Sequence, residues 1–293
     1  MEEQKIITQF IKNRIASGLA ETTIQSYCYA LKEFWQWLVK SDVNMVNSDT
    51  IENYFVYLRG RLYKGKKLSK TSIKDKYSVL HAYYEYAVQQ GYYAESPIKI
   101  KKPKADSDKI KVFSEEQIST MLSYLSDCSS FSKLRDRAIV CTLLSTGVRR
   151  SELLAISDVS GNSIVILGKG NKKRVVPISA SLKAVLKTYI IERNKIASCP
   201  NLTITNRGTA MTKNGLRAVF TRLSCQLGFA IHTHMFRHTY ATLALSNNLP
   251  IHNLQYYLGH SSLTTTQIYL HHVDSADEIA NRTNPLNNFK IFL

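Results

Sequence analysis

Four short segments of the sequence place cationic or titratable side chains next to turn residues. They are STGVRRSE (145–152), GKGNKKR (168–174), HTHMFRH (232–238) and YLGHSSLTTTQIYLHH (257–272). Arg149 opens a helix after Gly147, and its planar guanidinium suits the oxygens of a phosphate. Lys169 lies between glycines that let the backbone approach a ligand closely. Each segment alone is weak evidence, because surface arginines and solvated turns are common.

The third segment carries two histidines four residues apart, as a zinc-binding helix does. Met235 occupies the place where the HExxH motif has its glutamate, and no acidic third ligand is near, so we expect no metal. His234 and Arg237 lie three residues apart on one helical face, which pairs a proton-transfer group with a fixed cation. His238 suits a structural role. The GKGNKKR turn is not a Walker loop, because the GxxxxGK motif is absent.

Apolar periodicity predicts the elements that hold these segments. In the second half it predicts helices at 115–126, 132–145, 150–157, 180–194, 212–227, 234–247, 250–258 and 262–270. Two β-rich runs flank the GKGN turn and predict a hairpin over 163–178, with a short strand at 202–206. The predicted fold class is mainly α with a small β-hairpin or sheet in the C-terminal domain (α+β).

The first half predicts a small helical bundle. Its helices are expected at 3–16, 22–39, 49 onward and 70–90. Glu52 completes a capping-box pattern with Asp49 at the start of the third helix. Gly91 is a suitable C-terminal stop for the fourth helix.

Residues 95–109 contain two prolines and many lysines, as an exposed linker does. We therefore expect an N-terminal domain over 1–104 and a C-terminal domain, with a tail, over 105–293. The chain carries 39 Lys and Arg against 22 Asp and Glu, a formal charge of +17. Residues 1–104 hold 17 of these cations against 10 carboxylates, so both parts are basic. Such an excess indicates a polyanionic partner.

The basic charge of the first half is concentrated in residues 59–76, and the hairpin tip adds a second basic run. We expect both to contact the phosphate backbone of DNA, although a solvated surface loop is the alternative. The candidate DNA-binding residues are Arg59, Arg61, Lys64, Lys66, Lys67, Lys70, Lys74, Lys172, Lys173 and Arg174.

Composition argues against several classes of protein. The five cysteines are scattered without a CxxC pair, which disfavours a disulfide scaffold and a structural zinc site. No run approaches the ~20 apolar residues that a membrane span needs. The acidic N-terminus lacks the apolar stretch of a signal peptide. These features predict a cytoplasmic protein without a membrane partner.

Taken together, the four segments resemble the tyrosine recombinases, also called the phage-integrase family, and most closely its compact Xer-like members. The matching elements are TGVRRSE, GKGNKKR, HMFRH, and LGH with Tyr269 nine residues after its histidine. Their order and spacing agree over about residues 108–275, and the first half resembles the family's core-binding domain. Arg150 departs from the pattern, since Xer-like chains usually carry an apolar or small residue there. It either adds a DNA contact or points to solvent.

The resemblance implies a site-specific DNA recombinase that works through a 3′-phosphotyrosyl intermediate without metal, cofactor or ATP. The implied catalytic residues are Arg149, Lys169, His234, Arg237, His260 and Tyr269. Tyr269 would attack the phosphodiester, His234 would assist its proton transfer, and Lys169 would protonate the leaving 5′-oxygen. The two arginines and His260 would stabilise the charge on the phosphate oxygens. Glu152 and Asp136, beside these motifs, would orient the arginines.

The resemblance also implies partners. We expect double-stranded DNA with paired inverted-repeat half-sites and a homotetramer on two duplexes, formed by docking of the C-terminal tail into a neighbouring protomer. Whether an accessory protein takes part is left open. The compactness of the chain favours a Xer-like or mobile-element recombinase. Two other functions are considered: a DNA-binding accessory protein that has lost catalysis, and a type IB topoisomerase-like relaxer of DNA. The complete set of catalytic residue types argues against the first, and the short chain with its tail argues against the second.

Overall fold

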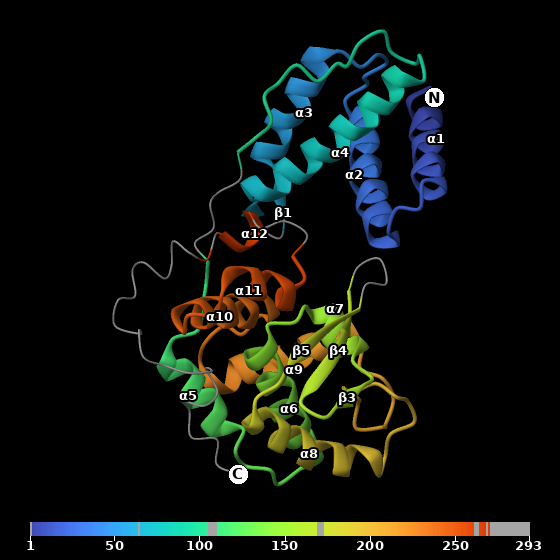
Figure 1. The fold of residues 1–293 in the computed structure, drawn as a ribbon. Helices are drawn as coiled ribbons and strands as arrows, with labels where there is room; N and C mark the ends of the chain where they lie inside the picture. Colours follow the sequence, from blue (N-terminus) through green and yellow to red (C-terminus); the bar gives the residue numbers. More distant parts are fainter. Residues whose placement is uncertain are drawn as a thin grey trace. The chain divides into compact units, whose positions relative to one another are not determined.

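The computed structural model describes residues 2–63, 65–104, 110–168, 173–260, 264–267 and 269 of the 293. The chain divides into two compact units, Met1–Asp108 and Lys109–Leu293, whose elements are labelled in Figure 1. The domain cut expected after residue 104 stays a prediction, because 105–109 lie outside the described residues. Lys64, Lys169 and Lys172 also lie outside them.

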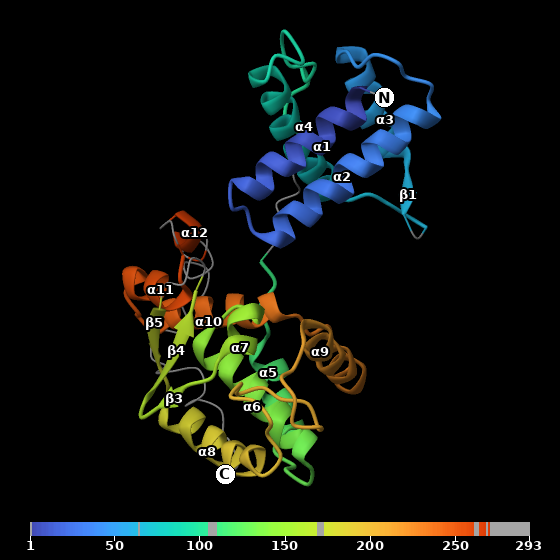
Figure 2. The same ribbon diagram turned by 90° about the vertical axis from the view of Figure 1, so that its right-hand side faces the viewer.

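Four helices build the first unit, as the apolar periodicity predicts. They are α1 (Glu2–Ala16), α2 (Glu21–Lys40), α3 (Ser48–Gly60) and α4 (Lys70–Gln89). Helix α1 lies alongside α2, and both contact α4 (Figure 2). Between α3 and α4, the strands β1 (Leu62–Tyr63) and β2 (Lys66–Lys67) form an antiparallel pair. Sequence patterning missed them, because two residues are too few to show an alternation.

The start of α3 differs from the predicted capping box. Asn47 is the N-cap, and its side chain accepts a hydrogen bond from the Thr50 N–H at 2.9 Å. The Thr50 hydroxyl accepts in return from the Asn47 N–H at 3.4 Å. The helix therefore begins before Asp49, and the expected pairing of Asp49 with Glu52 is wrong. Asparagine is as good an N-cap as aspartate, so the sequence contained two competing signals.

The core of the first unit is rich in aromatic rings. Phe34 packs against Tyr54 and Tyr84, with ring centroids 4.8 and 6.4 Å away. The hydroxyls of Tyr83 and Tyr84 both donate to Glu3, at 2.8 and 2.9 Å. This shared acceptor satisfies two buried hydroxyls and ties α1 to α4.

The second unit confirms the expected mainly α fold with a small antiparallel sheet. Its helices are α5 (Glu115–Tyr124), α6 (Phe131–Thr146), α7 (Arg150–Ala155), α8 (Ala180–Asn194), α9 (Lys213–Leu227), α10 (Thr233–Ser246), α11 (Ile251–Leu258) and α12 (Thr264–Gln267). Every residue of α6 from Arg135 to Thr146 is buried, as in a helix surrounded by its domain. Helices α8 and α10 pack against it. None of the helices that the structure describes is long and apolar enough to cross a membrane.

The predicted hairpin over 163–178 is confirmed and belongs to a three-stranded sheet. Its strands are β3 (Val159–Ser160), β4 (Ser163–Leu167) and β5 (Lys173–Pro177), in the order β3-β4-β5. In the register, Ile166 lies opposite Arg174 and Ile164 lies opposite Val176. All four side chains are buried, so one face of the hairpin points into the fold. The strand expected at 202–206 is reduced to a single bridge between Ile204 and Ala210.

Two glycines end helices beside the candidate site. Gly147 follows α6 with φ 58°, and Gly259 follows α11 with φ 64°, both left-handed. A Cβ on Gly147 would lie 2.5 Å from a ring carbon of Tyr240, and one on Gly259 would lie 2.9 Å from Nη1 of Arg174. Glycine is therefore required at both turns for conformation and for space.

Candidate active site

Arg149 stands at the N-cap of α7, two residues after the Gly147 turn. Its backbone N–H donates to Glu152 Oε2 at 2.8 Å, and its Nη1 donates to Oε1 of the same carboxylate at 3.0 Å. Nη1 and Nη2 also donate to the carbonyls of Leu258 and Gly259, at 3.2 and 3.0 Å. A guanidinium has five N–H donors, so Nε–H and one Nη2–H are left without a partner among the described residues. The side chain is 39% exposed, which leaves it accessible to an anion.

Arg237 approaches the same turns from α10. Its Nη1 donates to the Gly147 carbonyl at 3.0 Å, and its Nη2 donates to the Leu258 carbonyl at 2.8 Å. Leu258 therefore accepts from Arg149 and Arg237, which holds the two guanidinium groups close together. Burial, followed by the positive charge of Arg149, lowers the pKa of Arg237 to about 10. The site is thus electropositive and favours an anion between its arginines.

Glu152 is the buried carboxylate that organises this cluster. It accepts from Nη1 and Nη2 of Arg174, at 3.0 and 2.8 Å, in addition to the bonds from Arg149. Burial alone would raise the pKa of Glu152, but the hydrogen bonds from Arg174 and Arg149 outweigh it and hold the pKa below its usual value. Arg174 also donates through Nε to the Tyr257 carbonyl at 2.8 Å. Glu152 therefore connects α7, β5 and the end of α11.

The Glu152→Gln variant is expected to unfold more easily, by about 3 kcal/mol, because it leaves the Arg174 guanidinium buried without a counter-charge. The free energy of unfolding from urea titration measures this. Glu192→Gln is a matched control, since Glu192 pairs with Lys195 where both side chains are largely exposed. The Glu192→Gln substitution should lower the free energy of unfolding by less than about 1 kcal/mol. Equal losses in both variants would contradict the organising role of Glu152.

His260 follows the Gly259 turn and faces the arginines. Its Nδ1 lies 2.8 Å from the hydroxyl of Thr266, a fully buried residue of α12. If the Thr266 hydroxyl donates to Nδ1, the Nε2 of the neutral ring carries the hydrogen and is a donor for a phosphate oxygen. Burial, followed by the charges of Arg237, Arg149 and Arg174, lowers the pKa of His260 to about 4. The ring is therefore neutral at pH 7.

This low pKa predicts that folding stability depends on pH. Below about pH 6.5 the unfolded chain protonates His260 while the folded chain does not until about pH 4, so folding stability falls as the pH drops through this window. A His260→Asn variant should lose part of that pH dependence. Urea midpoints at pH 7 and pH 5 measure it. The same decline in the variant and in the parent chain would refute the assignment.

Tyr269 is buried and meets a histidine, but not the expected one. Its hydroxyl lies 2.9 Å from Nδ1 of His238, and the two rings are 5.6 Å apart between centroids. Burial raises the pKa of Tyr269, while the charges of Arg237 and Arg149 act in the opposite direction. His234 lies with its ring centroid 6.4 Å from that of His238. In this structure His238 therefore has the proton-transfer geometry that the sequence assigned to His234.

His234 itself faces the arginines at the surface of α10. Partial burial, followed by the charges of Arg237, Arg150 and Arg149, lowers its pKa. The structure thus brings together five of the six expected catalytic residues. They are Arg149, His234, Arg237, His260 and Tyr269. Lys169 lies outside the described residues, so its role stays a prediction.

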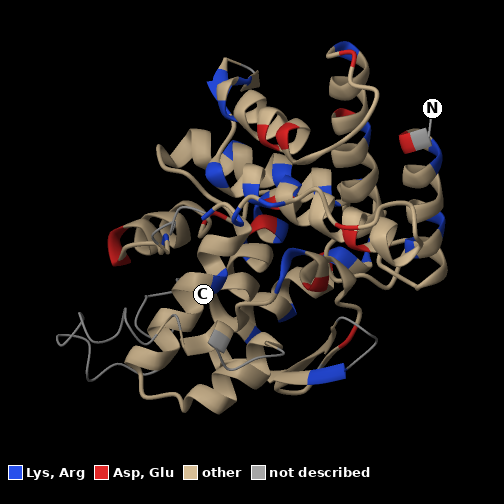
Figure 3. Cartoon of the chain, turned by 90° about the horizontal axis from the view of Figure 1, so that it is seen from above, with Lys and Arg blue, Asp and Glu red and all other residues tan. Residues whose placement is uncertain are grey.

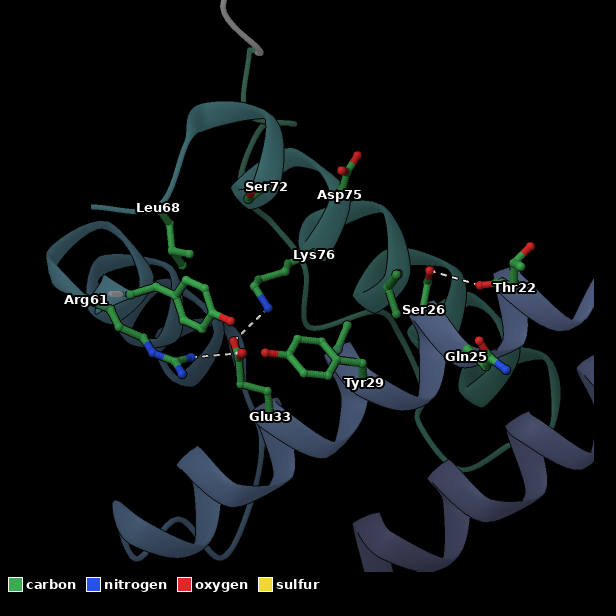
Figure 4. A pocket seen from close by; sticks show the side chains of 13 residues that line it. Thr22, Gln25, Ser26, Tyr29, Glu33, Arg61, Leu68, Ser72, Asp75 and Lys76 are labelled. Atoms are coloured by element: carbon green, nitrogen blue, oxygen red, sulfur yellow. Dashed lines mark hydrogen bonds and ion pairs between the residues drawn. The ribbon is translucent and has the colours of Figure 1, made fainter. Parts of the chain in front are cut away.

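The candidate DNA-binding residues fall into three groups. Arg59, Lys66, Lys67, Lys70 and Lys173 are exposed and Lys74 is half-buried. Arg61 pairs with Glu33 at 2.9 Å in a pocket of the first unit, where Lys76, which was not a candidate, also meets Glu33 at 2.8 Å (Figure 4). Arg174 differs from the expectation, because only 7% of its side chain is exposed and it is bound to Glu152. We now interpret Arg174 as a residue that positions the site.

The sequence patterns did not identify Arg174 and His238 as members of the site, and they wrongly placed Asp136 beside the site arginines. Arg174 alternates with the exposed Lys173 and Val175 along β5, so the two-residue period of a strand could have placed it inside. His238 carried no signal for a contact with Tyr269, which lies 31 residues further along the chain. Glu152 does orient Arg149, as expected. Asp136 instead pairs with Arg135 and Arg222 and contacts neither site arginine.

Comparison with known proteins identifies the family to which the chain belongs. The model of the phage integrase family matches residues 111–276, and that of the phage integrase N-terminal SAM-like domain matches residues 6–93. The chain therefore belongs to the phage integrase family, the tyrosine recombinases.

Among its relatives is the tyrosine recombinase XerC of Pediococcus pentosaceus, 31% identical over 86% of this chain and 88% of that one. XerC of Staphylococcus aureus is 30% identical over 88% of each chain. Similar solved structures include the XerH site-specific recombinase bound to palindromic difH substrate, with a TM-score of 0.74, 23% identity and coverage of 95% of this chain and 83% of that one. A lambda integrase dimer bound to a core site has a TM-score of 0.71 at 17% identity, covering 89% and 96%. These two structures support the fold.

Proposed function

We propose that this chain is a site-specific DNA recombinase that cleaves and rejoins duplex DNA through a covalent link to Tyr269. The observation that carries the proposal is the convergence of Arg149, Arg237 and His260 around the Gly259 turn. Tyr269 is close enough for both guanidinium charges to act on its pKa. A cluster of cations with unused N–H donors suits a phosphodiester in its transition state.

In the cleavage step, the Tyr269 oxygen forms a bond to phosphorus and the bond from phosphorus to the 5′-oxygen breaks. The phenol has a pKa of about 10 in water, so ionising it at pH 7 costs ~4 kcal/mol. His238 Nδ1, at 2.9 Å, is positioned to take the phenolic proton. Lys169 is the proposed donor to the leaving 5′-oxygen. Attack by another 5′-hydroxyl reverses the step, so strand joining needs no ATP.

The charges of the site match this step. Arg149, Arg174 and Arg237 carry three positive charges against the one negative charge of Glu152. Arg149 and Arg237 offer their remaining N–H donors to the non-bridging oxygens, and His260 offers Nε2. Because these groups are already held by backbone carbonyls and Glu152, little reorganisation is needed as charge develops.

We infer that the partner is double-stranded DNA with inverted half-sites, bound by both units. Exposed Lys and Arg residues occur on each unit. Figure 3 marks the positions of all described Lys and Arg residues along the ribbon. In support, the XerH recombinase structure holds a palindromic difH substrate, and the lambda integrase dimer is bound to a core site. A tetramer on two duplexes is also proposed; the tail that would dock between protomers lies outside the described residues.

The test is covalent trapping on nicked duplexes prepared from the DNA of the source cell. A nick lets the cleaved end diffuse away, so the covalent intermediate accumulates and survives SDS. We expect wild-type protein to capture a defined sequence with a free 5′-hydroxyl beside the cleaved phosphate. DNA binding without any covalent product would favour the silent accessory protein. Relaxation of supercoils without joining between duplexes would favour the topoisomerase-like function.

A further inference from the structure

A second cationic cavity lies beside the candidate active site. It has a volume of about 460 Å³ and is lined by parts of α9, the start of α10 and the first residue of α7. Arg150 and Arg217 supply two positive charges, and His232 and His234 add imidazole rings. Thr221 and Ser224 contribute hydroxyls, and none of the described residues that line it is an aspartate or glutamate. The cavity is therefore built for an anion.

The two arginines of this cavity differ from Arg149 in their contacts with the described residues. Within the described ranges, Arg150 and Arg217 form no hydrogen bond or ion pair, and both are exposed. Arg149, one residue earlier, is by contrast tied to Glu152 and two carbonyls. A guanidinium that is unpaired and lines a cavity without acids retains all five donors for a ligand.

The cavity and the candidate active site share His234, and arginines of both act on this residue. His234 lines the cavity, and Arg237, Arg150 and Arg149 all lower the pKa of this histidine. Arg149 and Arg150 are neighbours in the chain, so their Cα atoms are about 3.8 Å apart. Two adjoining cationic sites therefore suit a polyanion with closely spaced charges, such as a nucleic-acid backbone.

We propose that the cavity formed by Arg150, Arg217 and the start of α10 binds a phosphodiester that neighbours the cleaved one on the same strand. This inference rests on the proposed function, and it names a phosphate contact outside the catalytic residues. Phosphate contacts fix the register of a protein on DNA without reading its sequence. Arg150 and Arg217 are thus positioning residues that align the cleaved phosphate with Arg149 and Arg237.

The first test is the salt dependence of binding to a short duplex, measured with Arg150→Ala, Arg217→Ala and a control, Lys187→Ala. Lys187 is exposed on α8, and its replacement by alanine also removes one positive charge. Loss of one phosphate contact should lower the slope of log K against log salt by about 0.9. We expect this change in both arginine variants and a smaller one in the control. Equal changes in all three variants, or none in the arginine variants, would overturn the proposal.

The second test locates the contact with methylphosphonate, which removes the charge of one phosphate. Duplexes trapped by the wild-type protein are rebuilt with this substitution on either side of the cleaved position. Neutralising the neighbouring phosphate should slow covalent trapping about tenfold in the wild type and have little further effect in Arg150→Ala. Equal sensitivity of both proteins at every position would refute the contact.

These outcomes separate the two proposals. Binding slopes do not require cleavage, so they can be read in a Tyr269→Phe background even if no covalent product forms. Trapping without a slope change in the arginine variants overturns the phosphate cavity and leaves the recombinase intact. If the arginine variants instead change only the self-association of the protein, measured by sedimentation, the cavity binds a carboxylate of a second copy and the proposal is wrong.

Discussion

The Tyr269→Phe variant is expected to bind DNA as well as the wild type and to form no covalent product, a loss on the order of 10⁴-fold or more. The substitution removes only the hydroxyl that would attack the phosphorus. The ring stays in the small core that it shares with Tyr240 and Leu258, so the fold should be kept. Gel retardation measures binding, and SDS-stable complexes on nicked duplexes measure cleavage.

Tyr240→Phe is the matched control for this result. Tyr240 is also a buried tyrosine of the same core, and burial raises its pKa to about 12. Its trapping should stay within a few-fold of the wild type. If Tyr269→Phe retains covalent trapping, or if Tyr240→Phe loses it to the same degree, Tyr269 is not the nucleophile.

The Arg237→Ala variant is expected to lower the rate of covalent trapping by about 10² to 10³-fold, as removal of one donor to a developing oxyanion does. It should weaken DNA binding much less, because the buried guanidinium makes one contact among many on the phosphate backbone. Single-turnover trapping at saturating protein separates the two effects.

Alanine also removes the donors to the Gly147 and Leu258 carbonyls, so folding must be checked by thermal unfolding. Arg237→Lys addresses this, since it keeps the charge and loses the planar fork. We expect the lysine variant to fold like the wild type and to recover only part of the rate. Full activity in Arg237→Lys would mean that charge alone matters and would contradict the proposed role of the guanidinium N–H donors.

The helices of both units could be predicted because their signals are local. The apolar periodicity of α1, α2 and α4, the Ser114 cap of α5 and the left-handed Gly147 after α6 each act within a few residues. The hairpin β4–β5 was equally accessible, since two β-rich runs flank the GKGN sequence. Local rules failed where two signals competed, as at Asn47 and Asp49, or where the strand was too short, as in β1.

The site was predictable in its residue types and less so in its contacts. Arg149, Arg237 and His260 were singled out by spacing together with the resemblance, and their meeting at the Gly259 turn depends on long-range packing. Arg174 was misassigned because a cluster of basic residues at a hairpin tip suggests solvent, although strand alternation turns this one inward to Glu152. The proximity of His238 to Tyr269 is a tertiary contact that no local pattern encodes.

The most direct measurement of the central claim is the identity of the amino acid that becomes joined to DNA. Wild-type protein trapped on a nicked duplex is digested with nuclease and protease, and the peptide that carries the residual nucleotide is sequenced by mass spectrometry. We predict a single adduct on Tyr269, joined to a 3′-phosphate, with a free 5′-hydroxyl on the released strand. An adduct on any other residue, or a 5′-phosphate link, would contradict the mechanism.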